Sequence, residues 1–259
     1  MATARAVWSG AVSFGLVNIP VKLYTATENR DIAFTSLHAT DRSPLRRPYM
    51  CPVDNVPVAG KDITKGYEYA KNSFVVISDE DLDSVRVESS QHITVATFVD
   101  PDEVNPLFYE TSYYLGPTEA SVKPWELFRQ VLHRTNKVAI GQATLWRKEH
   151  IVALRPIGNA IVLSLLYYAD EVKPPPDLPL TKPIVISDAE LALADNLIDA
   201  LSGEFNPAMY RDRYREALMA MIEAKIDGKI IEVAPRVEVQ ATQDLMAALK
   251  ASLQATKKA

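Results

Sequence analysis

The sequence predicts an α+β protein that is mainly β, with a curved or closed sheet first and a helical region last. Three observations carry this: residues 6–34 look mostly like strand, later segments alternate apolar and polar residues, and the pattern turns helical after a proline-rich segment. Within residues 6–34, Gly10 and Gly15 interrupt an apolar, β-branched run, and Pro20 follows. Glycine in a strand marks a bulge or close backbone approach, and proline confines a strand to an edge or end. A sheet that bends and closes on itself needs such a segment.

The middle of the chain predicts further strands around one helix. Residues 123–135 are expected to be helical, because Pro124 suits the first turn and four residues form one apolar stripe: Trp125, Phe128, Val131 and Leu132. A short acidic helix is expected after Ser78. Turn signals are found at residues 147–149 and 156–159. Strands are expected at residues 74–77, 93–99, 138–147, 150–155 and 160–168.

Prolines at positions 174–176, with two more at 179 and 183, indicate a semi-rigid linker. We therefore expect a β core over residues 1–173, a linker over 174–186 and a helical region over 187–259.

The helical region has recognisable start and stop signals. Ser187 and Glu190 form a capping box ahead of residues 191–201. A second helix is expected to begin at Pro207, capped by Asn206, and to run to about residue 225, with Gly228 as its stop. A last helix fits residues 243–254.

Composition is that of a globular protein without a membrane segment. Of 259 residues, 47% are hydrophobic and 24% are charged. The N-terminus has no continuous apolar region typical of a secretory signal, and Ser164 interrupts the longest apolar run, which is far below the roughly 20 residues of a membrane helix. A single cysteine excludes an intramolecular disulfide and suits a reducing compartment. We expect a cytoplasmic protein.

The net charge of −5 conceals a segregation of charge along the chain. Residues 42–53 hold three arginines and no acid, and residues 123–155 hold seven Lys/Arg against two Asp/Glu. Residues 66–119 hold eleven Asp/Glu against two Lys/Arg. A phosphate-binding face needs local positive potential rather than a basic chain, so a basic inner and an acidic outer surface is one interpretation. Ordinary solvated surface is the other.

No motif predicts catalysis, a metal or a cofactor. Gly10 and Gly15 have the spacing of a phosphate-binding loop, but Leu16 and Val17 replace the required Lys and Ser/Thr. The acidic residues 79–83 lack the glycine and bidentate glutamate of an EF-hand, and an acidic helix N-terminus explains them better. The four histidines are scattered, and none has a second histidine or a cysteine at i+3 or i+4. A nuclease with clustered carboxylates and an interaction scaffold that uses residues 66–119 are the alternative functions.

Eight segments, in order over nearly the whole chain, resemble the Ku proteins in their bacterial form. No single segment identifies the family, but the occurrence of all eight in the same order does. They are residues 6–24, DITKGYEY at 62–69, ISDEDL at 77–82, SYYLGP at 112–117, VALRP at 152–156, YADEV at 168–172, FNPAMYRDRYREAL at 205–218 and DLMAALKASL at 244–253.

The resemblance implies a Ku-type β-barrel core with a long bridge, near residues 30–69, that encircles DNA. Two identical subunits would form a ring around the broken ends of double-stranded DNA and start non-homologous end joining. Binding rather than catalysis would be the task, and DNA ligase D would be the partner of the C-terminal region. A nucleoid-associated cytoplasmic location follows. Some bacterial relatives have a second cysteine where Asp54 stands, so Cys51 alone predicts no zinc site.

The resemblance also implies two sets of contact residues. Contacts to DNA phosphates are expected from Lys22, Arg30, Arg42, Arg46, Arg47, Lys123, Arg129 and Arg134, with Arg46 and Arg47 the strongest candidates. Contacts to the ligase are expected from Tyr210, Arg211, Tyr214 and Arg215, with core packing of the two tyrosines as the alternative. The short tail at residues 255–259 departs from the long lysine-rich extensions of some relatives.

Overall fold

The computed structural model describes residues 5–85, 91–146, 148–176, 186–228 and 249. Contacts within the chain define two units, Met1–Pro175 and Pro176–Ala259. The division falls among the prolines at 174–176. No helix in the described part of the chain is long and apolar enough to cross a membrane.

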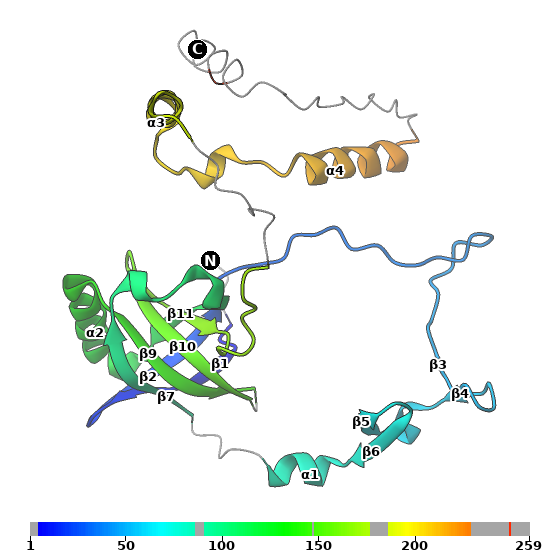
Figure 1. Ribbon diagram of the computed structural model, residues 1–259. Helices are drawn as coiled ribbons and strands as arrows, with labels where there is room; N and C mark the ends of the chain where they lie inside the picture. Colours follow the sequence, from blue (N-terminus) through cyan, green and yellow to red (C-terminus); the bar gives the residue numbers. More distant parts are fainter. Residues whose placement is uncertain (1–4, 86–90, 147, 177–185, 229–248, 250–259) are drawn as a thin grey trace. The chain divides into compact units, whose positions relative to one another are not determined.

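Seven strands of the first unit form a closed barrel (Figure 1), so the predicted closed sheet is confirmed. Their order is β1-β2-β8-β11-β10-β9-β7, and every neighbouring pair is antiparallel except β1 and β7. That parallel pair closes the barrel, with Val12 opposite Ile93. The strands are β1 (Trp8–Phe14), β2 (Val17–Thr25), β7 (His92–Val99), β8 (Tyr109–Pro117), β9 (Val138–Leu145), β10 (Lys148–Ile157) and β11 (Ala160–Leu166).

Two glycines allow the barrel strands to approach each other. A Cβ on Gly10 would overlap the carbonyl oxygen of Gln91, which confirms the close approach expected at this position. A Cβ on Gly141 in β9 would overlap the Thr94 carbonyl oxygen of β7, beside a register shift in that strand. Pro20 lies within β2 and pairs with Ala11 in the β1–β2 ladder, but it lies one residue beyond the β2–β8 ladder, so the expected ladder end is found on one side of the strand only.

Helix α2 (Val122–Thr135) confirms the predicted helix and contributes to the barrel core. Trp125, Phe128 and Leu132 are buried among inward-facing strand residues such as Val12 and Leu154. The indole Nε1 of Trp125 donates to the Leu115 carbonyl at 3.1 Å, which satisfies its one polar atom. The fourth residue of the predicted stripe, at position 131, is exposed instead.

A smaller apolar cluster covers the outer face of β9, β10 and β11. Val138, Ala153 and Leu166 are buried there beneath Val104 and Phe108. The covering residues belong to the connection between β7 and β8, which contains the 3-10 turns η2 (Pro101–Glu103) and η3 (Pro106–Phe108). Elsewhere in the barrel unit, the 3-10 turn η4 (Glu119–Ser121) leads from β8 into α2.

The chain leaves the barrel after β2 and returns at β7, and we call residues 26–85 the arm (Figure 1). It contains two separate two-stranded sheets, and none of its residues is buried. The expected strand at 74–77 and the helix after Ser78 are confirmed, but the first strand region ends at Thr25, where β2 loses its partner β8. The arm elements are β3 (Tyr49–Met50), β4 (Pro57–Val58), η1 (Gly60–Asp62), β5 (Lys65–Ala70), β6 (Ser73–Ile77) and α1 (Asp79–Ser84).

The β9–β10 connection is tighter than predicted. Lys148 already pairs with Leu145, so the turn expected at residues 147–149 lies earlier. The end of β9, both ends of β10 and the end of β11 each differ from the prediction by two residues. Trp146 occupies the first turn position with a φ of 48°, a left-handed conformation that a two-residue hairpin connection demands.

The second unit contains α3 (Asp188–Leu201), η5 (Pro207–Met209) and α4 (Arg213–Ile226). The capping box of Ser187 and Glu190 is confirmed. A continuous helix from Pro207 is wrong, because Asn206 caps only η5 and a new cap at Asp212, which accepts the Arg215 N–H at 2.9 Å, begins α4. The expected stop is confirmed: α4 ends just before the glycine at 228, whose φ is 72°. The helix expected at 243–254 lies outside the described residues.

Candidate nucleic-acid interface

Three of the expected phosphate-contacting arginines lie on one folded loop of the arm, residues 36–47, which we call the arginine loop. Backbone hydrogen bonds close it: His38 and Ser43 pair at 2.8 Å, and Leu45 donates to Ser36 at 2.9 Å. The Arg42 N–H donates to the His38 carbonyl at 2.8 Å, and Arg42 has a φ of 61°. A short hairpin therefore holds the cluster instead of an extended chain.

The charges of the arginine loop are not neutralised within it. Arg42, Arg46 and Arg47 are exposed, and no acidic side chain among the described residues pairs with them. The nearby Asp41 carboxylate accepts from the Ser43 N–H at 2.9 Å and lies 3.1 Å from the His38 ring, and the Ser43 hydrogen bond lowers the pKa of Asp41. The loop thus presents concentrated positive charge to its surroundings.

Two further expected residues lie near the start of the arm. Arg30 pairs with Glu28 at 3.2 Å on an exposed surface, so part of its charge is compensated. Lys22 is exposed on the outer face of β2, opposite Ser9 on one side and Gly116 on the other. The structure leaves Lys22 accessible to a phosphate.

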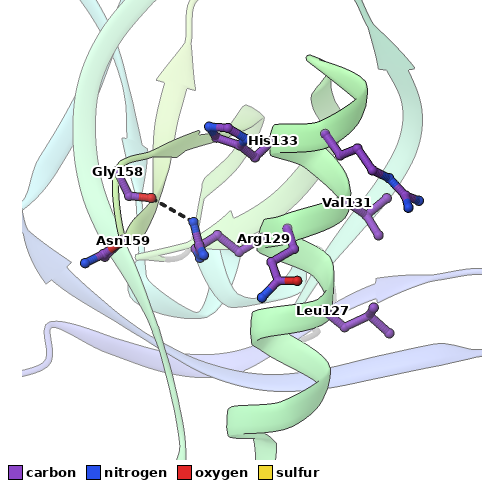
Figure 2. A pocket seen from close by; sticks show the side chains of 8 residues that line it. Leu127, Arg129, Val131, His133, Gly158 and Asn159 are labelled. Carbon is purple, nitrogen blue, oxygen red and sulfur yellow. Dashed lines mark hydrogen bonds between the residues drawn. The ribbon is translucent and has the colours of Figure 1, made fainter.

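The remaining three residues, Lys123, Arg129 and Arg134, lie on α2 of the barrel. Lys123 and Arg134 are exposed, but Arg129 is occupied. Its guanidinium donates to both Glu126 carboxylate oxygens, at 2.8 and 2.7 Å, and its Nη1 donates to the Gly158 carbonyl at 2.8 Å. Figure 2 shows this last bond joining α2 to the β10–β11 turn. These hydrogen bonds indicate a structural clamp. The bonds from Arg129 to Glu126, together with one from Gln130, lower the pKa of Glu126 to about 2.

The expected ligase-contacting residues are exposed in the second unit. Tyr210 and Tyr214 are each 76% exposed, so the core-packing alternative finds no support in the described residues. The rings of Phe205 and Tyr210 lie 6.0 Å apart, and a surface hollow of about 360 Å³ is lined by Met209, Tyr210, Arg211, Arg213 and Glu216. None of residues 186–228 is buried.

The described residues contain no group of three or more His, Cys, Asp or Glu side chains arranged to hold a metal ion. Cys51 is a free thiol whose hydrogen bond lowers the pKa of Asp54, and the turn between them is closed by Asn55 donating to the Cys51 carbonyl at 2.9 Å. The acidic residues after Ser78 form a helix start, in which Asp81 completes a capping box and Asp79 accepts from a lysine.

One feature of the interface was not expected from the sequence. The β5–β6 hairpin exposes apolar side chains on both faces: Tyr67 and Val75 lie opposite each other on one, and Phe74 and Val76 belong to the other. An isolated two-stranded hairpin is marginal in water, so such exposure indicates a binding partner. The sequence predicts only the second strand of this hairpin, at residues 74–77, and nothing in the described part of the chain covers its apolar side chains.

Comparison with known proteins identifies the family. A model of the Ku70/Ku80 β-barrel domain matches residues 13–193. A protein of Archaeoglobus fulgidus named non-homologous end joining protein Ku is 41% identical over 98% of this chain and 100% of its own length. Proteins of the same name from Desulfitobacterium hafniense and Bacillus subtilis are 40% and 37% identical, over 96% and 97% of this chain and 87% and 82% of theirs. With a closed barrel interrupted by a long arm, and with these matches, the chain belongs to the Ku family.

Proposed function

We propose that this protein binds the ends of double-stranded DNA, without sequence specificity, as a ring-shaped homodimer in non-homologous end joining. The observation that carries the proposal is the arm, a long insertion between two barrel strands that has no buried residue and carries unpaired arginines. An extended chain covers roughly 3.3 Å per residue, so an insertion of this length can pass around a duplex. The names of the similar proteins support the same pathway.

Contacts to phosphates account for the absence of sequence specificity. Arg42, Arg46, Arg47 and Lys22 present charge without an acidic partner among the described residues, and such charges position a duplex without reading its bases. Arg129 is left out of this set because Glu126 and the β10–β11 turn hold its guanidinium. A closed ring can be entered only at a DNA end, so the preference for ends comes from topology.

Homodimer formation is supported by the β5–β6 hairpin. Phe74 is 61% exposed and Tyr67 is 66% exposed, on opposite faces of the hairpin. Fully burying a phenylalanine side chain contributes roughly 1.5–3 kcal/mol, so covering the exposed part of Phe74 against a second copy favours dimer formation. The same contact would fix the arms of two chains around one duplex.

Competition between DNA forms tests this proposal. At moderate salt, a labelled linear duplex is bound by the protein, and unlabelled linear DNA or a relaxed, covalently closed circle of the same sequence is added. We expect the linear competitor to displace the probe and the circle to compete poorly. Equal competition by the circle would exclude a ring that loads at ends, and sedimentation of the free protein as a monomer would exclude the homodimer.

Recruitment of DNA ligase D is the second part of the proposal. Tyr210 and Tyr214 form an exposed aromatic surface with Arg211 and Arg215 beside them, and the described residues of this unit bury no core of their own. Aromatic and arginine side chains are enriched at protein interfaces. Replacing both tyrosines by alanine should abolish stimulation of ligation while DNA-end binding stays unchanged. Full stimulation by the double variant would exclude this surface as the ligase contact.

A further inference from the structure

An apolar groove opens beside α2 on the barrel. It has a volume of about 460 Å³ and lies between the helix, the β1–β2 turn and β7. Leu127 is 64% exposed, Phe98 45% and Val17 44%, although all three are large apolar residues. The lining is apolar except for Thr135 and Lys137, and it consists otherwise of Phe14, Val17, Ile19, Phe98, Pro124, Leu127, Phe128, Val131 and Leu132.

Three aromatic rings in contact with one another line this groove. The ring of Phe14 stacks on that of Phe128 at 5.1 Å, and its edge meets Phe98 at 6.4 Å. Phe128 is buried in the barrel core, so the stack is anchored in the fold. A preformed apolar groove of this kind binds a partner with little loss of its own conformational entropy.

A basic hollow flanks the groove on the other side of the same helix. Its volume is about 590 Å³, and Leu127 and Val131 line both depressions. Figure 2 shows these two side chains projecting from one side of α2 and Arg129 from the other, toward Gly158. No carboxylate lines either depression, whose polar residues are Arg129, Gln130, His133, Arg134, Asn159, Thr135 and Lys137.

We propose that this surface of α2, with its apolar groove and basic hollow, binds a segment of another protein that carries apolar side chains flanked by carboxylates. Apolar anchors enter the groove over Leu127 and Val131, and the carboxylates face Arg134 and His133. Arg129 and Lys137 already pair with Glu126 and Asp100. Arg134 is exposed and has no acidic partner among the described residues, so charge complementarity favours an acidic segment that reaches Arg134. DNA fits less well, since a phosphate backbone offers no apolar group for the groove. The inference does not depend on the proposed DNA binding.

Designed peptides provide the probe. Three labelled helical peptides share one length: the first has leucines along one face and glutamates elsewhere, the second has lysines for the glutamates, and the third has glutamines for the leucines. Fluorescence anisotropy with the full-length protein measures their affinities. We expect the first peptide to bind at least about tenfold more tightly than each of the others. Equal affinity of the lysine peptide, or no binding of the first peptide at about 1 mM, would overturn the proposal.

Variants locate the binding. Leu127→Ser should weaken the acidic peptide about tenfold, as should Arg134→Glu. Leu107→Ser is the matched control, because Leu107 is 66% exposed outside the groove, and Lys173→Glu is the control for the charge. Both controls should bind the peptide like the unmodified protein. Retained affinity in Leu127→Ser contradicts the proposal.

Two outcomes would assign the surface to another occupant and overturn the inference. The first is displacement of the acidic peptide by double-stranded DNA. The second is a loss of self-association in Leu127→Ser without any peptide, seen by sedimentation, which would make a second copy the occupant. If the proposal holds, DNA-end binding by Leu127→Ser is unchanged, because Leu127 carries no charge and lies outside the arm.

Discussion

Reversing the charge of the arginine loop should weaken DNA binding and leave the fold intact. In the double variant Arg46→Glu, Arg47→Glu, both altered side chains are exposed, and the single hydrogen bond lost is the long one from Arg47 Nη2 to Ser36 Oγ, at 3.5 Å. Exposed charges of this kind change the free energy of unfolding by about 0.5 kcal/mol or less. The thermal midpoint should therefore barely move.

The size of the binding defect follows from the number of phosphates lost. Each neutralised phosphate contributes about 0.9 to the slope of log affinity against log salt, so two arginines per chain contribute roughly 1.8, and a homodimer loses roughly 3.6. With about 1 kcal/mol for each exposed charged contact, four lost contacts predict a loss of ~4 kcal/mol, or about a thousandfold in Kd.

A titration of linear duplex at several salt concentrations measures both quantities. The matched control is Lys148→Glu, Lys173→Glu, which makes the same charge change at exposed positions outside the arm. The control should lose some affinity through long-range repulsion and keep the slope. An unchanged slope in the arginine variant would refute the reasoning, and a collapsed melting curve would show that the loop arginines are structural.

Three other predictions concern the barrel, its clamp and the arm. Gly141→Ala should destabilise the protein by roughly 3 kcal/mol in a denaturant titration, since the added Cβ overlaps the backbone of β7, whereas Gly66→Ala meets only ordinary contacts and should cost less than about 1 kcal/mol. Hydrogen bonds from Arg129 lower the folded-state pKa of Glu126 to about 2. The stabilisation that ionised Glu126 contributes is therefore present above its ordinary pKa of 4.5 and is lost as pH falls toward 2. In thermal melts over that pH range, Glu126→Gln should lose less stability than the unmodified protein. Tyr67→Ser with Val75→Ser should shift sedimentation of the free protein toward monomer, while barrel stability, measured by denaturant, stays unchanged.

Local signals predicted much of the fold. Capping at Ser187, the glycine at position 10 and the α2 helix each depend on residues that are close in sequence or on a steric rule, and all were confirmed, although Val131 of the predicted stripe is exposed. The helix expected from Pro207 failed because two caps compete within a few residues. Asn206 and Asp212 each accept a backbone N–H, so Asn206 caps only the short turn η5 and Asp212 begins α4. Sequence periodicity does not weigh one cap against another.

The candidate site was less predictable, because charge alone does not reveal its partners. Arg129 and Arg134 look alike in the sequence, but only the fold brings the Gly158 carbonyl to Arg129 across the β10–β11 turn. Glu126 lies three residues earlier, so a helical ion pair could have been anticipated from spacing. The hairpin at residues 65–77 cannot be understood from the sequence for another reason. Its apolar residues predict burial, but nothing within the described part of the chain buries them.

An uncovered arm links assembly to function under the proposed role. If the β5–β6 hairpin is completed only by a second chain, then the arm of a lone chain contains a marginally stable segment. The arginine loop of that chain keeps its own backbone hydrogen bonds but has no fixed position relative to a duplex. Dimer formation would order the hairpin, and with it the position of the arginines relative to a duplex. Because phosphate contacts are individually weak, several must be aligned at once to hold DNA. DNA affinity should therefore depend on protein concentration across the range in which dimers form, even at a constant excess of protein over DNA ends. Tyr67→Ser with Val75→Ser should lower DNA affinity although neither residue carries charge, and an unchanged affinity in this variant would separate assembly from DNA binding.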